Sequence, residues 1–237
     1  MNEHQVVSPQ QWLLARKALL EKEKAFTRAR DELSQARRDL PWERIEKSYV
    51  FEGPSGPESL SDIFAGRSQL IVYHFMFGPN ADIGCKSCSF WADNFNGVVP
   101  HLAERDATLV AISRAPSSKL EAFKQRLGWS FKWLSSGKND FNVDLGVAFR
   151  DEDRKAGTMT YNYAPLASGP SELHGISVFF KDASGAVFHT YSTYGRGLDM
   201  LNVAYHYLDL VPKGRDEAGL TSPNAWLKLH DEYPQSA

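Results

Sequence analysis

Large apolar residues recur every seven positions near the start of the chain. They are Trp12, Leu19, Phe26, Leu33 and Leu40, and most positions around them are charged. Such a period is typical of an α-helix with an apolar seam. Ser8 is a good N-cap residue and Pro9 suits the first helical position. The pattern predicts one long helix over residues 8–40. It would lie on the core as a solvated helix that clasps its own domain, or pair with a second subunit as a homodimer.

After residue 45 the periodicity changes to that of buried strands and shorter helices. Residues 69–75 and 107–113 are nearly continuous apolar runs, which indicate strands covered on both faces. A short helical segment is expected at 60–64, helices at 85–105, 117–127 and 198–210, and further strands at 49–51, 131–134, 176–181 and 187–193. Gly97 and Pro100 are expected to break or kink the first of the longer helices. Residues 135–173 carry no clear pattern.

This order of elements predicts the fold class. Two parallel βα units followed by an antiparallel hairpin and a final helix describe an α/β protein, a mixed sheet with helices on both faces. The thioredoxin architecture has this order. We expect a helical arm over residues 1–44, a thioredoxin-like domain over 45–212 and a tail over 213–237.

Composition excludes several classes of protein. Of the 237 residues 42% are hydrophobic, enough to bury a sizeable core. The formal charge of −2 offers no long-range attraction to nucleic acid or anionic lipid. Apolar runs such as 70–77 are too short to cross a bilayer, and residues 1–11 lack the apolar stretch of a secretory signal. We therefore expect a cytoplasmic protein without nucleic-acid or membrane partners.

The candidate chemistry lies in the only two cysteines, in Cys85-Lys86-Ser87-Cys88. Cys85 falls where a strand has ended and a helix begins, and unpaired N–H groups at that place stabilise a thiolate. Lys86 adds a cation. Cys88 follows one turn later, where two helical side chains meet. Cys85 would attack a disulfide, and Cys88 would resolve the mixed disulfide.

Two alternatives stay open for this pair. The Cys-x-x-Cys spacing is also that of two ligands of a zinc site, for which His74 and His174 are the best further ligands. No second paired motif such as His-x-x-x-His occurs, which argues against zinc. Two thiolates and one imidazole also suit copper. If the pair neither exchanges disulfides nor binds a metal, it is inert.

Other side chains are candidates for substrate binding or for tuning the thiols. Trp91 and Asp93 lie on the same helix as the cysteines, and Arg114 ends the strand 107–113 at the same edge of the sheet. Asp93 is interpreted as a surface carboxylate. Alternatively, it could accept the proton of the Cys88 thiol. The segment 189–197 gathers aromatic rings and an arginine, which suits packing or a binding surface.

Several segments together resemble a known family. They are His74-Phe75-Met76-Phe77-Gly78-Pro79, the segment 84–93 around the cysteines, Ser113-Arg114-Ala115-Pro116, Gly128-Trp129, His174-Gly175, 189–197 and Arg37-Arg38-Asp39-Leu40-Pro41-Trp42. Over nearly the whole chain the sequence is similar to an uncharacterised thioredoxin-like family, a domain of unknown function distantly similar to thiol-specific antioxidant proteins. The resemblance implies a thioredoxin-like fold and a dithiol site at Cys85 and Cys88, and it implies no substrate.

Two departures from better-known relatives matter. Thioredoxins carry a cis-proline before the hairpin, where this chain has His174-Gly175-Ile176. That proline helps dock peptides and keeps metals off the pair, so its absence argues against general reduction of protein disulfides. Peroxiredoxins carry Pro-x-x-x-Thr-x-x-Cys, whereas Pro79 lies six residues before Cys85 with no threonine between them. Efficient peroxidase activity is therefore not expected.

The sequence thus predicts a thioredoxin-like dithiol–disulfide oxidoreductase that needs no cofactor. Its catalytic residues would be Cys85 and Cys88, and His174, Arg114, Lys86 and Trp91 would bind substrate or tune the thiols. Its partner would be a thiol or disulfide, either a protein or a small molecule. The alternative is a copper or zinc carrier, or a non-catalytic binding protein.

Overall fold

The computed structural model describes residues 4–234. The chain consists of two compact units, and the boundary between them in the sequence lies between Pro41 and Trp42. The first unit is one helix, α1 (Pro9–Arg38). Ser8 caps it, since the Ser8 hydroxyl accepts from the Gln11 N–H while the Gln11 side chain accepts from the Ser8 N–H. The long helix is therefore confirmed. Within this unit no residue of α1 is buried.

The second unit is built on a mixed sheet with the strand order β1-β10-β9-β4-β5-β6-β2-β3. Its strands are β1 (Glu43–Arg44), β2 (Val50–Gly53), β3 (Gly56–Ser59), β4 (Gln69–His74), β5 (Ala107–Ser113), β6 (Lys132–Ser135), β9 (Gly175–Lys181) and β10 (Val187–Tyr194). β4, β5 and β6 run parallel, whereas β9 pairs antiparallel with β4, and β10 with β9. This is the predicted mixed sheet.

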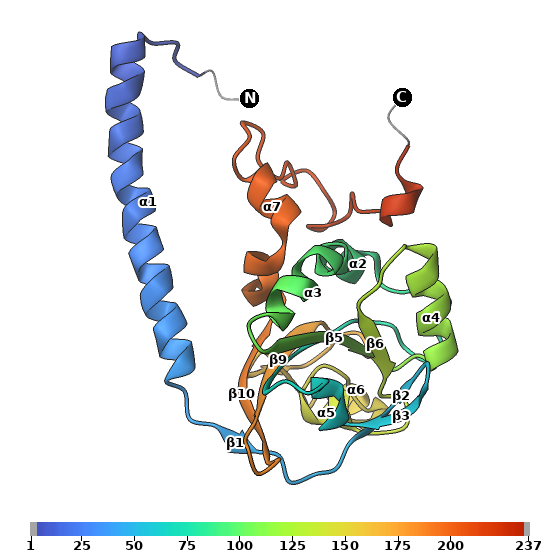
Figure 1. Ribbon diagram of the computed structural model, residues 1–237. Helices are drawn as coiled ribbons and strands as arrows, with labels where there is room; N and C mark the ends of the chain where they lie inside the picture. The colour runs from blue at the N-terminus through green and yellow to red at the C-terminus, as the bar shows by residue number, and fades with distance from the viewer. Residues whose placement is uncertain (1–3, 235–237) are drawn as a thin grey trace. The chain divides into compact units, whose positions relative to one another are not determined.

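Helices cover both faces of this sheet (Figure 1). The helices of the second unit are η1 (Asp62–Phe64), α2 (Lys86–Ala92), α3 (Phe95–Ala103), α4 (Ser117–Arg126), α5 (Phe141–Asp144), α6 (Asp151–Ala156), η2 (Gly195–Leu201), α7 (Val203–Leu208) and η3 (His230–Glu232). Alternate side chains of β4 point to opposite faces, so Tyr73 enters the core beneath α2 while Leu70 and Val72 enter the other core with η1 and α5. The sheet is therefore buried on both sides.

The helix expected over 85–105 is interrupted, but not where we predicted. α2 ends at Ala92 because the Asn94 side-chain amide donates to the carbonyls of Phe90 and Trp91, at 3.1 Å each. An amide that competes for helix carbonyls ends a helix locally. Gly97 and Pro100 lie within α3 instead, so the expectation of a break at these residues was wrong.

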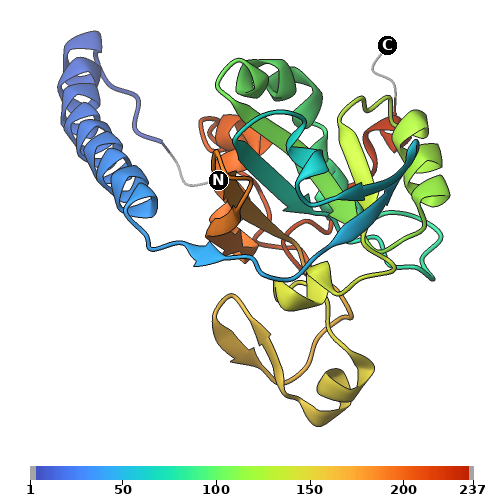
Figure 2. The same cartoon turned by 60° about the horizontal axis from the view of Figure 1, so that its bottom comes forward.

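Two further segments differ from expectation. The final helix is split into η2 and α7, because Asn202 caps α7 by accepting from the Tyr205 N–H at 3.0 Å. The unassigned residues 135–173 contain α5, α6 and a small hairpin of β7 (Met159–Tyr161) and β8 (Ala164–Leu166), whose course Figure 2 shows. These elements are too short for a periodic pattern to reveal them.

No helix among residues 4–234 is long and apolar enough to span a membrane.

Candidate functional site

Cys85 lies where the chain turns from β4 into α2. The Cys85 N–H donates to the carbonyl of Met76 at 3.1 Å, which holds the returning loop against the end of the strand. Cys85 is the N-cap residue of α2, and its Sγ accepts from the Cys88 N–H at 3.5 Å. Cys85 is partly exposed, whereas Cys88 is buried.

The surroundings of Cys85 favour its thiolate. Hydrogen bonds from the Cys88 thiol, from the backbone N–H groups of Cys88 and Ser87, and from the Ser87 side chain outweigh the opposing effect of burial. Together they lower the pKa of Cys85 to about 6. A large fraction of Cys85 is therefore ionised at neutral pH, and the thiolate is the nucleophilic form of cysteine.

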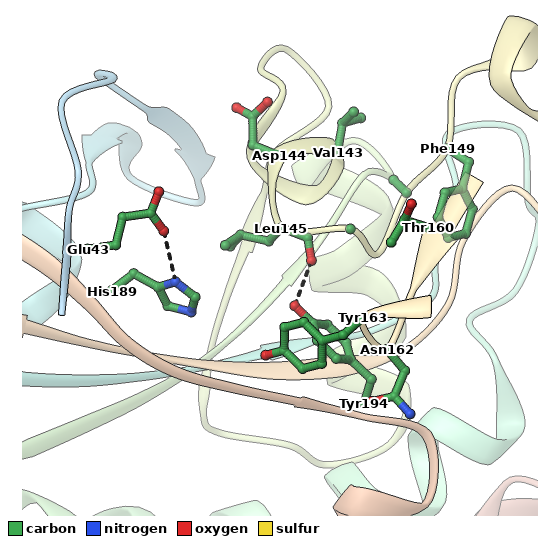
Figure 3. A pocket seen from close by; sticks show the side chains of 12 residues that line it. Glu43, Val143, Asp144, Leu145, Phe149, Thr160, Asn162, Tyr163, His189 and Tyr194 are labelled. Carbon is green, nitrogen blue, oxygen red and sulfur yellow. Dashed lines mark hydrogen bonds and ion pairs between the residues drawn. The ribbon is translucent and has the colours of Figure 1, made fainter. Parts of the chain in front are cut away.

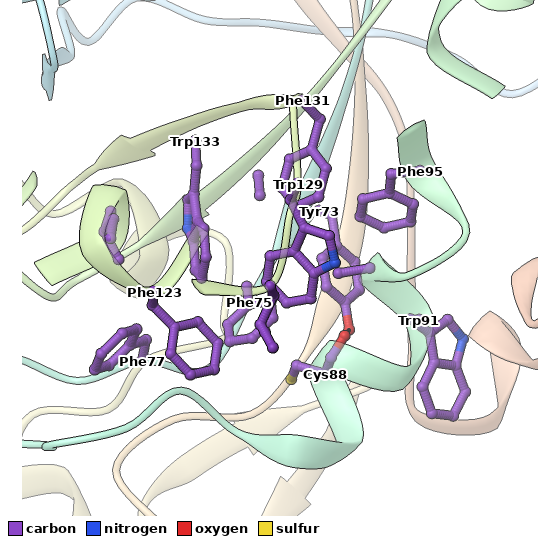
Figure 4. Close-up of a cluster of buried hydrophobic side chains, with 14 of the residues drawn as sticks. Tyr73, Phe75, Phe77, Cys88, Trp91, Phe95, Phe123, Trp129, Phe131 and Trp133 are labelled. Atoms are coloured by element: carbon purple, nitrogen blue, oxygen red, sulfur yellow. Dashed lines mark hydrogen bonds between the residues drawn. The ribbon is translucent and has the colours of Figure 1, made fainter. Parts of the chain in front are cut away.

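Cys88 lies one turn further on, in the opposite environment. It is fully buried in the aromatic cluster between α2 and the sheet (Figure 4). Its Sγ accepts from the Met76 N–H at 3.5 Å, and the Tyr73 hydroxyl donates to its carbonyl at 3.4 Å. Burial, followed by the hydrogen bond and charge of Cys85, raises the pKa of Cys88. The two thiols thus form one ionised and one protonated group.

Trp91, on α2, lies beside His174. The Trp91 indole N–H donates to the carbonyl of Leu198 at 2.9 Å, and its ring centroid is 5.7 Å from that of His174. Burial lowers the pKa of His174, which favours the neutral imidazole. Both side chains line a cavity of about 570 Å³. Arg196, Arg215 and Glu217 also line it, whereas neither cysteine does. Trp91 and His174 therefore border a cavity that the two cysteines do not line.

Arg114 faces a carboxyl group that sequence reasoning missed. Its Nη1 lies 3.6 Å from Oε1 of Glu172, which is 8% exposed and pairs by an isolated bridge with Ala148. Glu172 also packs on Gly78, in the loop that leads to Cys85. Glu172 lies in the segment without a sequence pattern, so nothing in the sequence indicated it.

The remaining candidates are less involved. Lys86 is exposed. Asp93 accepts from the Trp129 indole N–H at 2.8 Å and contacts Nδ1 of His230 at 2.7 Å, so it joins the tail to α2 instead of facing Cys88. Arg196 is almost fully exposed, while Tyr194 is buried.

The geometry offers no support for the metal-carrier alternative. Nowhere in residues 4–234 do three His, Cys, Asp or Glu side chains gather as a metal site requires. His74 bonds through Nε2 to the Ser177 hydroxyl at 2.9 Å and contacts the ring of Phe141, in the second core. It is therefore on the other side of the sheet from Cys88.

A second cavity of about 410 Å³ lies between β10 and the segment 143–163 (Figure 3). Its walls include Glu43, whose carboxylate is 3.5 Å from Nδ1 of His189, and Tyr194, whose hydroxyl donates to the carbonyl of Leu145 at 2.9 Å. None of the predicted dithiol-site residues lines it.

Comparison with known families agrees with the resemblance seen in the sequence. The family described as "Bacterial protein of unknown function (DUF899)" matches residues 1–233. No curated protein matches the chain.

The solved structures that the chain is similar to include peroxiredoxins. Peroxidoxin BcpB from Mycobacterium tuberculosis is 15% identical, with a TM-score of 0.45 over 68% of this chain and 93% of that one. Peroxiredoxin Q of Xanthomonas campestris is 14% identical, with a TM-score of 0.44 over 71% and 96%. The mitochondrial 2-Cys peroxiredoxin of Plasmodium falciparum is 14% identical, with a TM-score of 0.40 over 76% and 96%. Likeness at this level concerns the fold, and no function follows from it.

Proposed function

The chain belongs to the bacterial DUF899 family, and we propose that it is a dithiol–disulfide oxidoreductase whose reactive pair is Cys85 and Cys88. The observation that carries the proposal is the contrast between the two thiols. Cys85 is partly exposed and its pKa is lowered, whereas Cys88 is buried and its pKa is raised. Attack and resolution need one accessible thiolate and one sheltered thiol within reach of it.

The reaction balances as two successive exchanges. The Cys85 thiolate attacks one sulfur of a substrate disulfide, forming a mixed disulfide and releasing the first substrate thiolate, which takes a proton. Cys88 then loses its proton and attacks Cys85 Sγ, which releases the second substrate thiol. The substrate gains two electrons, and the protein ends as the Cys85–Cys88 disulfide. A second thiol pool returns it to the dithiol by the reverse steps.

The neighbouring side chains support binding on this side of the molecule. Trp91 and His174 line the 570 Å³ cavity, Arg114 holds a guanidinium near the loop before Cys85, and Lys86 adds an exposed cation next to it. We propose that these four residues contact the substrate or tune the thiols.

A redox titration tests the proposal. The protein is equilibrated in glutathione buffers of known potential, alkylated and weighed by mass spectrometry. We expect a reversible two-electron transition between about −120 and −270 mV, the range of dithiol oxidoreductases. If no disulfide forms between Cys85 and Cys88 in that range, the proposal fails.

Two cysteine variants separate the roles of the thiols. Cys85→Ser is expected to abolish turnover with a disulfide substrate, because the nucleophile is gone. Cys88→Ser is expected to accumulate mixed disulfides at Cys85, because resolution is lost. Near-ultraviolet circular dichroism of both variants controls for folding. Unchanged turnover in Cys85→Ser would contradict the assignment.

A further inference from the structure

A buried carboxyl group lies beside the loop that leads to Cys85, and one of its oxygens lacks the hydrogen bond that a buried carboxylate needs. Glu172 is 8% exposed, and its Oε1 has no hydrogen-bond partner among the described residues. The nearest cation, Nη1 of Arg114, is 3.6 Å away, too long for a hydrogen bond. An ionised carboxylate so placed is costly, whereas a protonated one is not.

Glu172 faces the loop that leads to Cys85. Both of its carboxylate oxygens are close enough to Gly78 that a Cβ added to that glycine would lie 3.6 Å from each. Gly78 lies in the loop between β4 and Cys85, and the adjacent Phe77 carbonyl accepts from the N–H of Ala115, next to Arg114. The ends of β4 and β5 thus place Glu172 and Arg114 at the same edge as the reactive sulfur.

Two charged groups act on Glu172 in this arrangement: Arg114, at the end of β5, and Cys85, at the start of α2. Burial, the largest effect, raises the pKa of Glu172 to about 7; Arg114 opposes this increase and the Cys85 thiolate adds to it. Two negative charges in one poorly hydrated site disfavour each other, so the ionisations of Glu172 and Cys85 are coupled.

We propose that Glu172 is a redox-linked proton carrier, which holds a proton while Cys85 is a thiolate and loses it when Cys85 enters a disulfide. This inference rests on the proposed dithiol function and adds a regulatory property to the same site. In the disulfide form the sulfur carries no charge, and the Glu172 carboxylate is left with Arg114 alone.

The step balances in electrons and protons. Reduction by two molecules of reduced glutathione brings two electrons and two protons. One proton goes to Cys88 and, with Cys85 left as a thiolate, the second goes to Glu172. Glutathione disulfide is released. Without an ionisable group at position 172, the second proton is released to solvent instead.

The test is the pH dependence of the equilibrium constant for reduction of the full-length protein by glutathione, measured between pH 6 and 7. In wild type, proton uptake by Glu172 offsets part of the proton release from Cys85, so the constant is expected to rise less than in Glu172→Gln. In Glu172→Gln the constant is expected to rise about fivefold, because Cys85 then ionises with a net loss of one proton. Glu52→Gln, on β2 and paired with Lys138, is the matched control and should behave as wild type.

A second measurement needs no variant. Reduced-minus-oxidised infrared difference spectra of the wild type should show a protonated carboxyl band that appears on reduction at pH 6.5. Equal pH dependence in wild type and Glu172→Gln, or no such band, would overturn the inference while leaving the dithiol function intact. Absence of any disulfide in the wild-type titration would instead remove the proposed function itself.

Discussion

His74 is a single buried imidazole that depends on its neighbours for its protonation state. It is 1% exposed, its Nε2 contacts the Ser177 hydroxyl, and that hydroxyl contacts Ser192 at 2.8 Å, which in turn contacts Nε2 of His189 at 2.7 Å. Burial, and secondarily the charge of His189, lowers the pKa of His74 to about 3. The imidazole is therefore neutral in the folded protein.

This shift predicts a loss of stability in mild acid. The folded pKa lies below the unfolded value of 6.5, so the unfolded chain binds more protons as the pH falls from about 6.5 towards 3. At pH 5 we expect His74 to lower the free energy of unfolding by about 2 kcal/mol relative to pH 7. Urea unfolding at both pH values measures it. His74→Gln should lose that much of the pH dependence, whereas His206→Gln, at an exposed position, should keep it.

At the scale of secondary structure, strongly apolar or periodic segments were predictable and irregular ones were not. β4 and β5 were recognised within a residue of their bounds, because buried parallel strands form continuous apolar runs. The interruption after Ala92 was misplaced, because it depends on where one amide side chain points. Glu172 was missed because only the folded chain brings it to Arg114 and to the loop before Cys85.

At the start of β9 there is no space for a side chain larger than that of glycine. A Cβ at Gly175 would lie 2.7 Å from Cδ1 of Tyr194, whose ring is held by its hydrogen bond to Leu145. We expect Gly175→Ala to lower the free energy of unfolding by about 2 kcal/mol or more, because overpacking displaces the ring or the strand. Thermal and urea unfolding report the change.

A second glycine provides the matched comparison. Gly97 lies exposed within α3 with no atom within 4 Å of an added Cβ. Gly97→Ala should stabilise the protein by about 0.5–1 kcal/mol, since alanine restricts the unfolded chain and suits a helix. Destabilisation by both substitutions to the same extent would show that close contact at Gly175 is not the cause.

At the scale of the whole molecule, α1 bears on whether two copies of the chain associate. Within α1 its seam residues Trp12, Leu19, Phe26 and Leu33 are not covered by other residues of the helix. Repeated large apolar side chains on one stripe favour burial against another surface. We propose a homodimer through this helix.

Sedimentation equilibrium of the full chain tests this proposal. Phe26→Glu should shift the protein to monomer, because it places a charge in the seam. Thr27→Glu adds the same charge one residue away, off the seam, and should leave the dimer intact. Removal of residues 1–41 should have the effect of Phe26→Glu. A full chain that is monomeric at all concentrations would refute the proposal.

The sequence by itself determined the elements whose signals are local. A capping residue and a seven-residue period define α1, apolar runs define the central strands, and spacing alone identifies Cys85 and Cys88 as a pair. Only the tertiary structure decided how the two thiols differ and which carboxyl group accompanies them. Burial of Cys88 under Tyr73 and the approach of Glu172 and Arg114 to the loop before Cys85 join residues far apart in the chain. Desolvation and charge act through space, so their effects appear only once the chain has folded.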